Sequence, residues 1–337
     1  MAGEPAERAL AYWLGQVRPL PSGSEEAARV LTHARQALRL AARQGAAPEP
    51  LAELALALHR PLMSRGLVLT WAQDLQALWE ARPDLRAAAP ALGENLLSAW
   101  TAAGQWQQAH AILHALQRTR PQHRPQTARL LYRQGSLLWM QGHWRPALHL
   151  ARQAWRLAPR QQPRLRVAVA ALLMLTAWRL GRGKQARRWG RRALALCPPD
   201  DLAWRGRLHH YLLLVHLPQD TAAAARHLSR ALEHLRAAQA HLQLAHLWAD
   251  ATNLYLAQGR PDRATEALAQ SYALWRQIED PAGLADYYRH AAIVTHALGR
   301  VRLARDYAAH AAERWAALGV HAEVRRCQRL LEQWARS

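Results

Sequence analysis

The sequence lacks phenylalanine and has a single lysine, Lys184, whereas arginine supplies the rest of its 45 basic residues and tryptophan occurs 15 times. We interpret this skew as the codon usage of a GC-rich genome. Strand signals are nearly absent too, with no alternation of β-branched residues and no Asn-Gly or Asp-Gly turn between apolar runs. These absences exclude a sheet. The abundant Ala, Leu, Arg and Gln, with apolar residues three and four positions apart, predict an all-α chain.

Long apolar runs and cysteines are equally scarce. The longest apolar run, residues 167–178, is too short to cross a bilayer and predicts a buried helix. The N-terminal MAGEPAERAL carries acids and a proline where a signal peptide needs basic residues and then an apolar stretch. Cys197 and Cys327 are too few for a disulfide framework and are expected to be reduced thiols. We therefore expect a cytoplasmic protein without a membrane partner.

Acidic residues are missing from one long segment. Positions 95–199 contain 18 Arg and Lys and no Asp or Glu, so that they supply +18 of the net charge of +21. Codon usage can favour Arg over Lys, but it does not remove every carboxylate from one segment and leave acids on both sides. The segment therefore predicts a surface for a negatively charged partner, the other interpretation being a solvated basic face that aids solubility. Its densest part forms a predicted basic patch of Arg187, Arg188, Arg191 and Arg192.

Catalytic and metal-binding motifs are also missing. No Ser-centred elbow, H-E-x-x-H or glycine-rich phosphate loop occurs, and the acid-free segment holds no carboxylate pair. His110 and His114 lie four residues apart, as two ligands on one helix would, but no Cys or carboxylate nearby completes a metal site. We expect no enzyme activity, no cofactor and no metal.

Regularly spaced small residues are what the sequence does contain. In the stretch GSLLWMQGHWRPALHLARQAWRLAP, residues 135–159, Gly142 belongs to a series that recurs every 38 to 40 residues. The equivalent positions are Gly66, Gly104, Gly142, Gly181, Gln219, Gly259 and Gly299. Glycine lets the chain leave one helix in a left-handed conformation and enter the next, so the period predicts helical hairpins with turns at these positions.

Alanine and proline follow the glycines at fixed distances. Alanine predominates five and twelve residues after each glycine, where it lets antiparallel helices approach closely, and a proline seventeen residues after it ends the second helix in four repeats. One repeat shows the full pattern in Gly135, Gly142, Trp144, Ala147, Ala154 and Pro159. This pattern resembles a tetratricopeptide repeat. Its long period is similar to the helical-repeat sensor domains of large bacterial transcriptional activators, and the resemblance covers about residues 24–319.

The resemblance implies an α-solenoid, a right-handed superhelix of about eight antiparallel helix pairs followed by a C-terminal capping helix. We divide the chain into an irregular N-terminal helix pair at 1–48, tetratricopeptide-like repeats at 49–319 and the capping helix at 320–337. A cap of this kind shields the last hydrophobic face of a solenoid.

The resemblance also implies a ligand site. Ligands of tetratricopeptide-repeat proteins usually lie along the concave surface lined by the first helix of each pair, and some are held through a peptide carboxylate by an Asn and basic residues of successive repeats. Asn95 falls on such an Asn position, and Arg129 and Arg133 fall on two basic positions. Leu56 and Arg60 depart from the pattern in the preceding repeat.

The two arginines belong to a helix face that suits an acidic peptide. Arg129 and Arg133 share the predicted face with Tyr132, Ser136 and Met140, which combines fixed charge with an apolar floor. Arginine pairs with carboxylates through a bidentate fork, so we predict that these five residues and Asn95 bind the ligand.

Two functions from different classes follow. The first is a non-catalytic interaction scaffold that binds an acidic protein segment or peptide along its basic central repeats, in a regulatory, signalling or transcription-linked system. The alternative is a nucleic-acid-binding helical-repeat protein that neutralises phosphates with residues 95–199. The lack of a recognisable base-reading module favours the first, and an enzyme ranks third.

Overall fold

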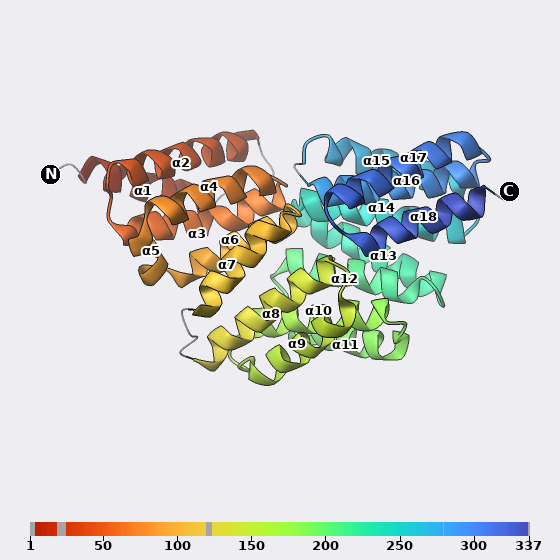
Figure 1. Cartoon of the computed structure of the whole chain (residues 1–337), viewed down its shortest axis with the longest axis horizontal. Coiled ribbons are helices and arrows are strands. Elements are labelled where there is room, and N and C mark those ends of the chain that lie inside the picture. Colours follow the sequence, from red (N-terminus) through yellow and green to blue (C-terminus); the bar gives the residue numbers. More distant parts are fainter. Residues whose placement is uncertain (1–3, 19–24, 119–122, 279, 336–337) are drawn as a thin grey trace. The chain divides into compact units, whose positions relative to one another are not determined.

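The computed structural model describes residues 4–18, 25–118, 123–278 and 280–335, and within these ranges it contains helices and no strand (Figure 1). This confirms the predicted all-α class. The helices are α1 (Glu4–Val17), α2 (Glu25–Arg43), α3 (Pro48–Ser64), α4 (Val68–Ala81), α5 (Pro83–Ala88), α6 (Pro90–Ala102), α7 (Trp106–Arg118), α8 (Arg124–Met140), α9 (Trp144–Leu157), α10 (Pro163–Arg179), α11 (Gly183–Leu196), α12 (Leu202–His216), α13 (Thr221–Ala237), α14 (His241–Ala257), α15 (Pro261–Trp275), α16 (Pro281–Ala297), α17 (Val301–Ala317) and α18 (His321–Trp334).

The chain divides into two units. The first consists of Met1–Thr119, Gln239–Leu242 and Ile278–Asp280, and the second of the remaining residues, so that α1–α7 lie in the first and α8–α18, apart from the start of α14, in the second. Consecutive helices form the eight predicted pairs, α18 packs along α17 as the cap, and the short helix α5 is an addition that the sequence pattern did not predict. The boundaries proposed at 48 and 319 stay predictions, and residues 19–24 of the first linker lie outside the described residues.

Glycines end the first helices as the period predicts. Gly142 has a φ of +84°, and the N–H of His143 donates to the carbonyl of Leu138 at 2.8 Å, which satisfies an otherwise free acceptor at the end of α8. The same left-handed conformation and hydrogen bond occur at Gly66, Gly104, Gly181, Gly259 and Gly299. The turn at Gln219 is also present, and here the Asp220 side chain caps α13 by accepting from the Ala223 N–H at 2.8 Å.

Alanines lie where the paired helices meet. Five residues after six of the seven turn positions lie fully buried alanines, which are Ala109, Ala147, Ala186, Ala224, Ala264 and Ala304, and Trp71 is buried at the seventh. Twelve residues after a turn position, the fully buried alanines are Ala154, Ala193, Ala231 and Ala311. Because a methyl group takes little space, the second helix of each pair approaches the first closely, as predicted.

Prolines follow the second helices. α9 ends at Leu157 and α11 at Leu196, shortly before Pro159 and Pro198. Pro83 follows α4 and also opens α5, because proline fits the first turn of a helix. Pro121 lies outside the described residues.

The two cysteines form no disulfide with each other, as the sequence predicts. Cys197 and Cys327 are free and buried, and burial raises the pKa of each to about 11. Across the described residues, no helix combines the length and the apolarity that crossing a bilayer requires.

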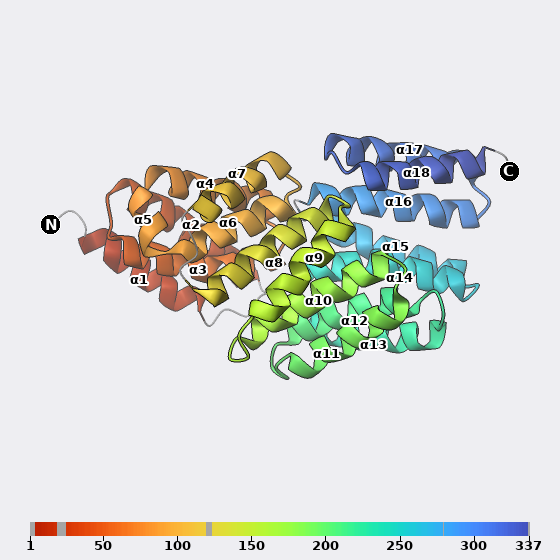
Figure 2. The same cartoon turned by 60° about the horizontal axis from the view of Figure 1, so that its bottom comes forward.

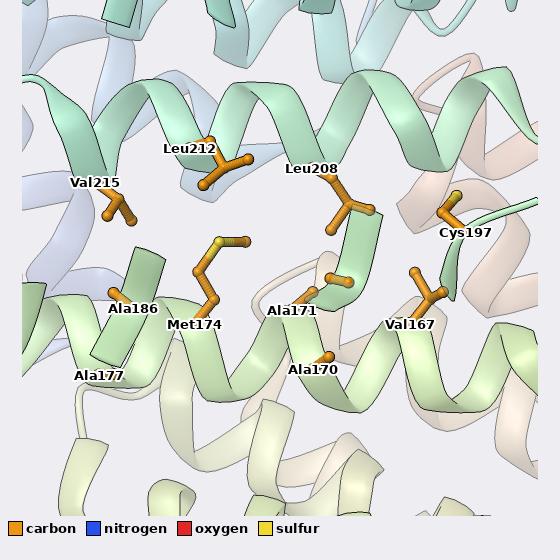
Figure 3. Close-up of a cluster of buried hydrophobic side chains, with 11 residues drawn as sticks. Val167, Ala170, Ala171, Met174, Ala177, Ala186, Cys197, Leu208, Leu212 and Val215 are labelled. Atoms are coloured by element: carbon orange, nitrogen blue, oxygen red, sulfur yellow. The ribbon is translucent and has the colours of Figure 1, made fainter. Parts of the chain in front are cut away.

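The core of the second unit centres on α10, beside which α8, α9, α11 and α12 pack (Figure 2). Its residues 167–177 are all buried, which confirms the predicted buried helix. Met174 of α10 and Leu212 of α12 point toward one another in this core (Figure 3). Gly190 of α11 closes the remaining side, because a Cβ atom built on it would lie only 2.8 Å from Met174 Sδ and would overlap Leu212.

The core packing predicts that Gly190→Ala destabilises the protein, although Ala favours a helix by about 1 kcal/mol over Gly. Overpacking a close-packed core costs about 1–3 kcal/mol, and both neighbours are buried too deeply to move freely. Gly15→Ala in α1 is the matched control, since nothing lies within 4 Å of its added methyl group. We expect a lower thermal midpoint for Gly190→Ala and a slightly higher one for Gly15→Ala by circular dichroism. Equal shifts would contradict the packing.

Candidate functional site

Five of the six residues predicted to bind a ligand lie on α8. Arg129, Tyr132, Arg133, Ser136 and Met140 are all half-buried. Tyr132 packs against the core that α9 and α10 share, and the Arg133 guanidinium lies 5.6 Å from the centre of the Tyr132 ring. The helix therefore carries positive charge beside an aromatic floor.

The sixth residue, Asn95, lies half-buried on α6 in the first unit. Its role as a ligand-binding residue stays a prediction, as do the roles of the five residues on α8.

The helix α12, which is the first helix two pairs after α8, adds residues that the sequence analysis missed. Arg207 Nη2 donates to the Tyr211 hydroxyl at 3.1 Å, and its guanidinium lies 4.4 Å from the ring centre of Trp204. Burial alone would lower the pKa of Arg207, but Tyr211 and Tyr132 outweigh it and raise that pKa. Because Tyr132 of α8 is near enough to act on Arg207, we refer to Tyr132, Arg133, Arg207 and Tyr211 as the α8–α12 cluster.

The residues of the predicted basic patch on α11 contact different neighbouring side chains. Arg187 Nη1 donates to Gln219 Oε1 at 2.9 Å, and Arg192 lies 4.7 Å from the ring centre of Trp155. Arg188 and Arg191 are exposed. The four residues therefore lie on the outer face of one helix and form no single pocket.

The basic residues of the acid-free segment differ in exposure between the first and second helices of the pairs. On the second helices α9 and α11 they are mostly exposed, whereas on α8 and α10 four of them are half-buried: Arg129, Arg133, Arg166 and Arg179. Half-buried arginines are less screened by solvent and salt than exposed ones. The first helices therefore carry the less screened arginines of the acid-free segment.

Charged side chains from α12, α14 and α16 form a buried network inside the second unit. Arg289 donates from Nε and Nη2 to Asp286 Oδ1 at 2.9 and 2.6 Å, and the same Nη2 lies 2.8 Å from His290 Nε2. His210 Nε2 lies 2.8 Å from Asp250 Oδ2, and Asp250 Oδ1 lies 3.4 Å from His290 Nε2. The side chains of Arg289 and His290 are 6% and 0% exposed.

This network resembles a metal site in its donors but contains its own cation. Asp250, Asp286 and His290 each place one ligand atom within 4.8 Å of the others. Burial opposes ionisation of Asp286, yet Arg289 and His290 outweigh it and hold the pKa of that carboxyl well below its usual range. The pKa of Asp250 is likewise lowered, by His210 and His290. Since the Arg289 guanidinium already pairs with Asp286, and Asp250 already contacts His210 and His290, the arrangement fits a structural ion network.

A signal for the network was present in the sequence. His210, Asp250 and His290 are spaced 40 residues apart, which is one repeat, so they occupy the same position in three successive pairs. These residues are far from one another in sequence, and they meet because stacking brings together residues that are one period apart.

A second cluster consists of four histidines between α12 and α13. His209 Nδ1 lies 2.9 Å from His227 Nδ1, and ring contacts extend the row to His234 and His216. Burial, neighbouring imidazoles and nearby arginines lower the pKa of His209 and of His227 to about 4. These two imidazoles are therefore neutral at pH 7.

Helix pairs joined by glycine turns and stacked through alanine define the chain as a tetratricopeptide-like helical repeat protein. Neither a known family model nor a curated protein matches the sequence. Among solved structures, it is similar to NprR in complex with its cognate peptide NprX, with 14% identity, a TM-score of 0.62 and coverage of 80% of this chain and 82% of that one.

Two further solved structures are similar to this chain. A Rap protein complexed with Competence and Sporulation Factor matches with 13% identity and a TM-score of 0.60 over 99% of this chain and 98% of that one. A STAND protein with a tetratricopeptide repeat sensor from Pyrococcus horikoshii matches with 12% identity and a TM-score of 0.53 over 83% of this chain and 42% of that one. At such low identity the likeness establishes the fold.

The buried network predicts that Asp286→Asn is strongly destabilising. The substitution leaves Arg289 buried without its carboxylate, which costs about 3–5 kcal/mol. Glu266→Gln is the control, because the Arg263–Glu266 pair of 2.7 Å is more than half exposed and contributes less than about 1 kcal/mol. Urea unfolding at pH 7 should show a large loss for the first variant and almost none for the second; similar losses would contradict a structural role for the network.

The histidine row predicts acid sensitivity. An unfolded histidine has a pKa of about 6.5, whereas the pKa of folded His209 and His227 is about 4, so the unfolded chain takes up protons first as the pH falls. The part of the free energy of unfolding that depends on these two neutral imidazoles is fully present above pH 6.5 and is lost as the pH falls from 6.5 to 4. In a His209→Gln/His227→Gln variant the thermal midpoint should fall less between pH 7.5 and 5 than in the parent. His149→Gln, at an exposed position on α9, should leave the parent's pH dependence unchanged.

Proposed function

We propose that this protein is a non-catalytic interaction scaffold that binds an acidic protein segment or peptide along α8 and the neighbouring first helices of its second unit. Arg129, Tyr132, Arg133, Ser136 and Met140 would form the contact surface. The observation that carries the proposal is the α8–α12 cluster, in which the Arg133 guanidinium lies 5.6 Å from the Tyr132 ring centre and Arg207 donates to the Tyr211 hydroxyl. Two arginines with an aromatic floor match a carboxylate and its adjacent apolar atoms.

The surrounding charge supports an acidic partner. No residue between 95 and 199 is acidic, so α8, α9, α10 and α11 contribute positive charge and no carboxylate to the second unit. A field of one sign attracts an oppositely charged segment and raises its association rate. Asn95 of α6 is proposed as a ligand-binding residue of the first unit, where its side-chain amide can donate to a carboxylate.

The similar structures support a peptide-binding regulator. NprR was solved with its cognate peptide, and a Rap protein was solved with Competence and Sporulation Factor. By analogy we assign the present chain to a signalling or transcription-linked regulatory system in the cytoplasm.

Nucleic acid is the second candidate partner, and the exposed arginines of α11 favour it. Arg188 and Arg191 project from a helix whose neighbours are also basic, as a phosphate-binding face would require. This face and the α8 surface can be separated by mutation, because they lie on different helices.

We predict that Arg129→Glu/Arg133→Glu reduces binding of an acidic ligand by at least a hundredfold, since it removes two attractive contacts and adds two repulsive ones. Arg187→Glu/Arg191→Glu is the matched control with the same change in net charge. The measurement is the anisotropy of a fluorescein-labelled octaglutamate peptide at 150 mM salt, with thermal midpoints to verify folding.

A duplex DNA of random sequence serves as the second probe. A phosphate surface distributes affinity over many charges, so both double variants would weaken DNA binding and both would flatten its salt dependence. Loss of octaglutamate binding to the same degree in both double variants would contradict a site on α8.

A further inference from the structure

Arg179, at the end of α10, lies in a cage of three tryptophans outside the proposed α8 surface. Its guanidinium carbon is 5.8 Å from a ring centre of Trp139 on α8, 5.4 Å from Trp144 on α9 and 4.9 Å from Trp178 on α10. Cation–π attraction holds a guanidinium in place without neutralising it. The cage therefore contains a positive charge that still requires an anion.

Glu323 of α18 pairs with Arg179 through only one of its carboxylate oxygens. Its Oε1 lies 3.2 Å from Arg179 Nη2, and the two side chains are only 11% and 21% exposed. Arg179 Nε, Trp139 Nε1 and Glu323 Oε2 are buried without a hydrogen-bond partner among the described residues, although Glu323 Oε2 comes within 3.5 Å of Arg326 Nη1. Arginine can hold a carboxylate through two parallel hydrogen bonds, and here it makes a single contact.

The start of α18 reaches this cage from the far end of the chain. α18 packs along α17, and its first turn lies against the turn between α8 and α9, since a Cβ atom built on Gly142 would be 2.7 Å from Ala322 Cβ. Burial lowers the pKa of Arg179, and the negative charge of Glu323 opposes this effect. Arg179 therefore depends on a carboxylate from outside its own helix pair.

We propose that Arg179, Trp139, Trp144 and Trp178 form a carboxylate-binding pocket for an acidic side chain of the partner, and that Glu323 occupies this pocket until the partner displaces it. The inference rests on the proposed function, because it gives the acidic segment a second contact. A carboxylate of the partner can accept hydrogen bonds from both Nε and Nη2 of Arg179, whereas Glu323 contacts Nη2 alone. The partner's carboxylate therefore makes one more hydrogen bond than Glu323 does. Glu323 has the advantage of its tether, which gives it an effective concentration on the order of millimolar.

Glu323→Gln in the full chain removes the internal competitor's charge but keeps a hydrogen-bonding side chain of the same size. We expect it to bind fluorescein-labelled octaglutamate at least tenfold more tightly than the parent. Glu332→Gln is the matched control, since it removes one negative charge from an exposed position of the same helix. It should leave the affinity unchanged. Adding Arg179→Gln to Glu323→Gln should abolish the gain.

Glu323→Asp keeps Arg179 paired while withdrawing the carboxylate by one methylene, and it should show a smaller gain of the same sign. It provides the test if Glu323→Gln melts below the assay temperature. Equal affinities of Glu323→Gln and Glu332→Gln, or no octaglutamate binding by any variant, would overturn the pocket.

The Arg129→Glu/Arg133→Glu variant separates this inference from the proposed function. If the affinity for octaglutamate falls in this variant but does not change in Glu323→Gln, the result supports the α8 site and rejects the pocket. A gain with Glu323→Gln that persists when Arg129 and Arg133 are replaced would support the pocket and reject the α8 site.

Discussion

The close approach of helices at alanine and glycine is the constraint on which the rest of this structure depends. A single helical hairpin cannot bury its apolar face, so each pair must stack against the next, and the stack stays tight only where side chains are small. Gly190 leaves the space that Met174 and Leu212 fill, and Gly283 leaves the space that the Trp275 indole fills. Large side chains therefore fit into these interfaces because the glycines opposite them have no side chain.

Stacking in a constant register has a second consequence, which is that equal positions of successive pairs meet. His210, Asp250 and His290 come together in this way, and Asp286 and Arg289 complete their network. A buried ion network of this kind contributes little net stability over well-packed apolar residues. It does fix the register of α12, α14 and α16, because a shift would leave buried charges without partners.

The uneven distribution of charge along the chain gives the second unit its chemical character. Several carboxylates after position 199 turn inward, as Asp250 and Asp286 do, whereas the arginines of α8 and α10 lie half-buried in a segment without acids. Arg164–Asp201 at 3.3 Å and Arg179–Glu323 at 3.2 Å are ion pairs that lead out of that segment. Carboxylates from later in the chain therefore pair with arginines of this basic segment at these two points.

The helices, the glycine turns and the buried alanines could be predicted from the sequence alone, because each depends on local backbone conformation and on short, regular spacing. The sequence did not reveal the short helix α5, where one proline both follows a helix and begins the next. Three features became visible only in the folded chain: Arg207 donates to Tyr211, buried Arg289 pairs with Asp286, and α18 reaches the cage around Arg179. Such contacts depend on the small rotations that accumulate from pair to pair in a solenoid, and no local pattern of residues encodes their sum.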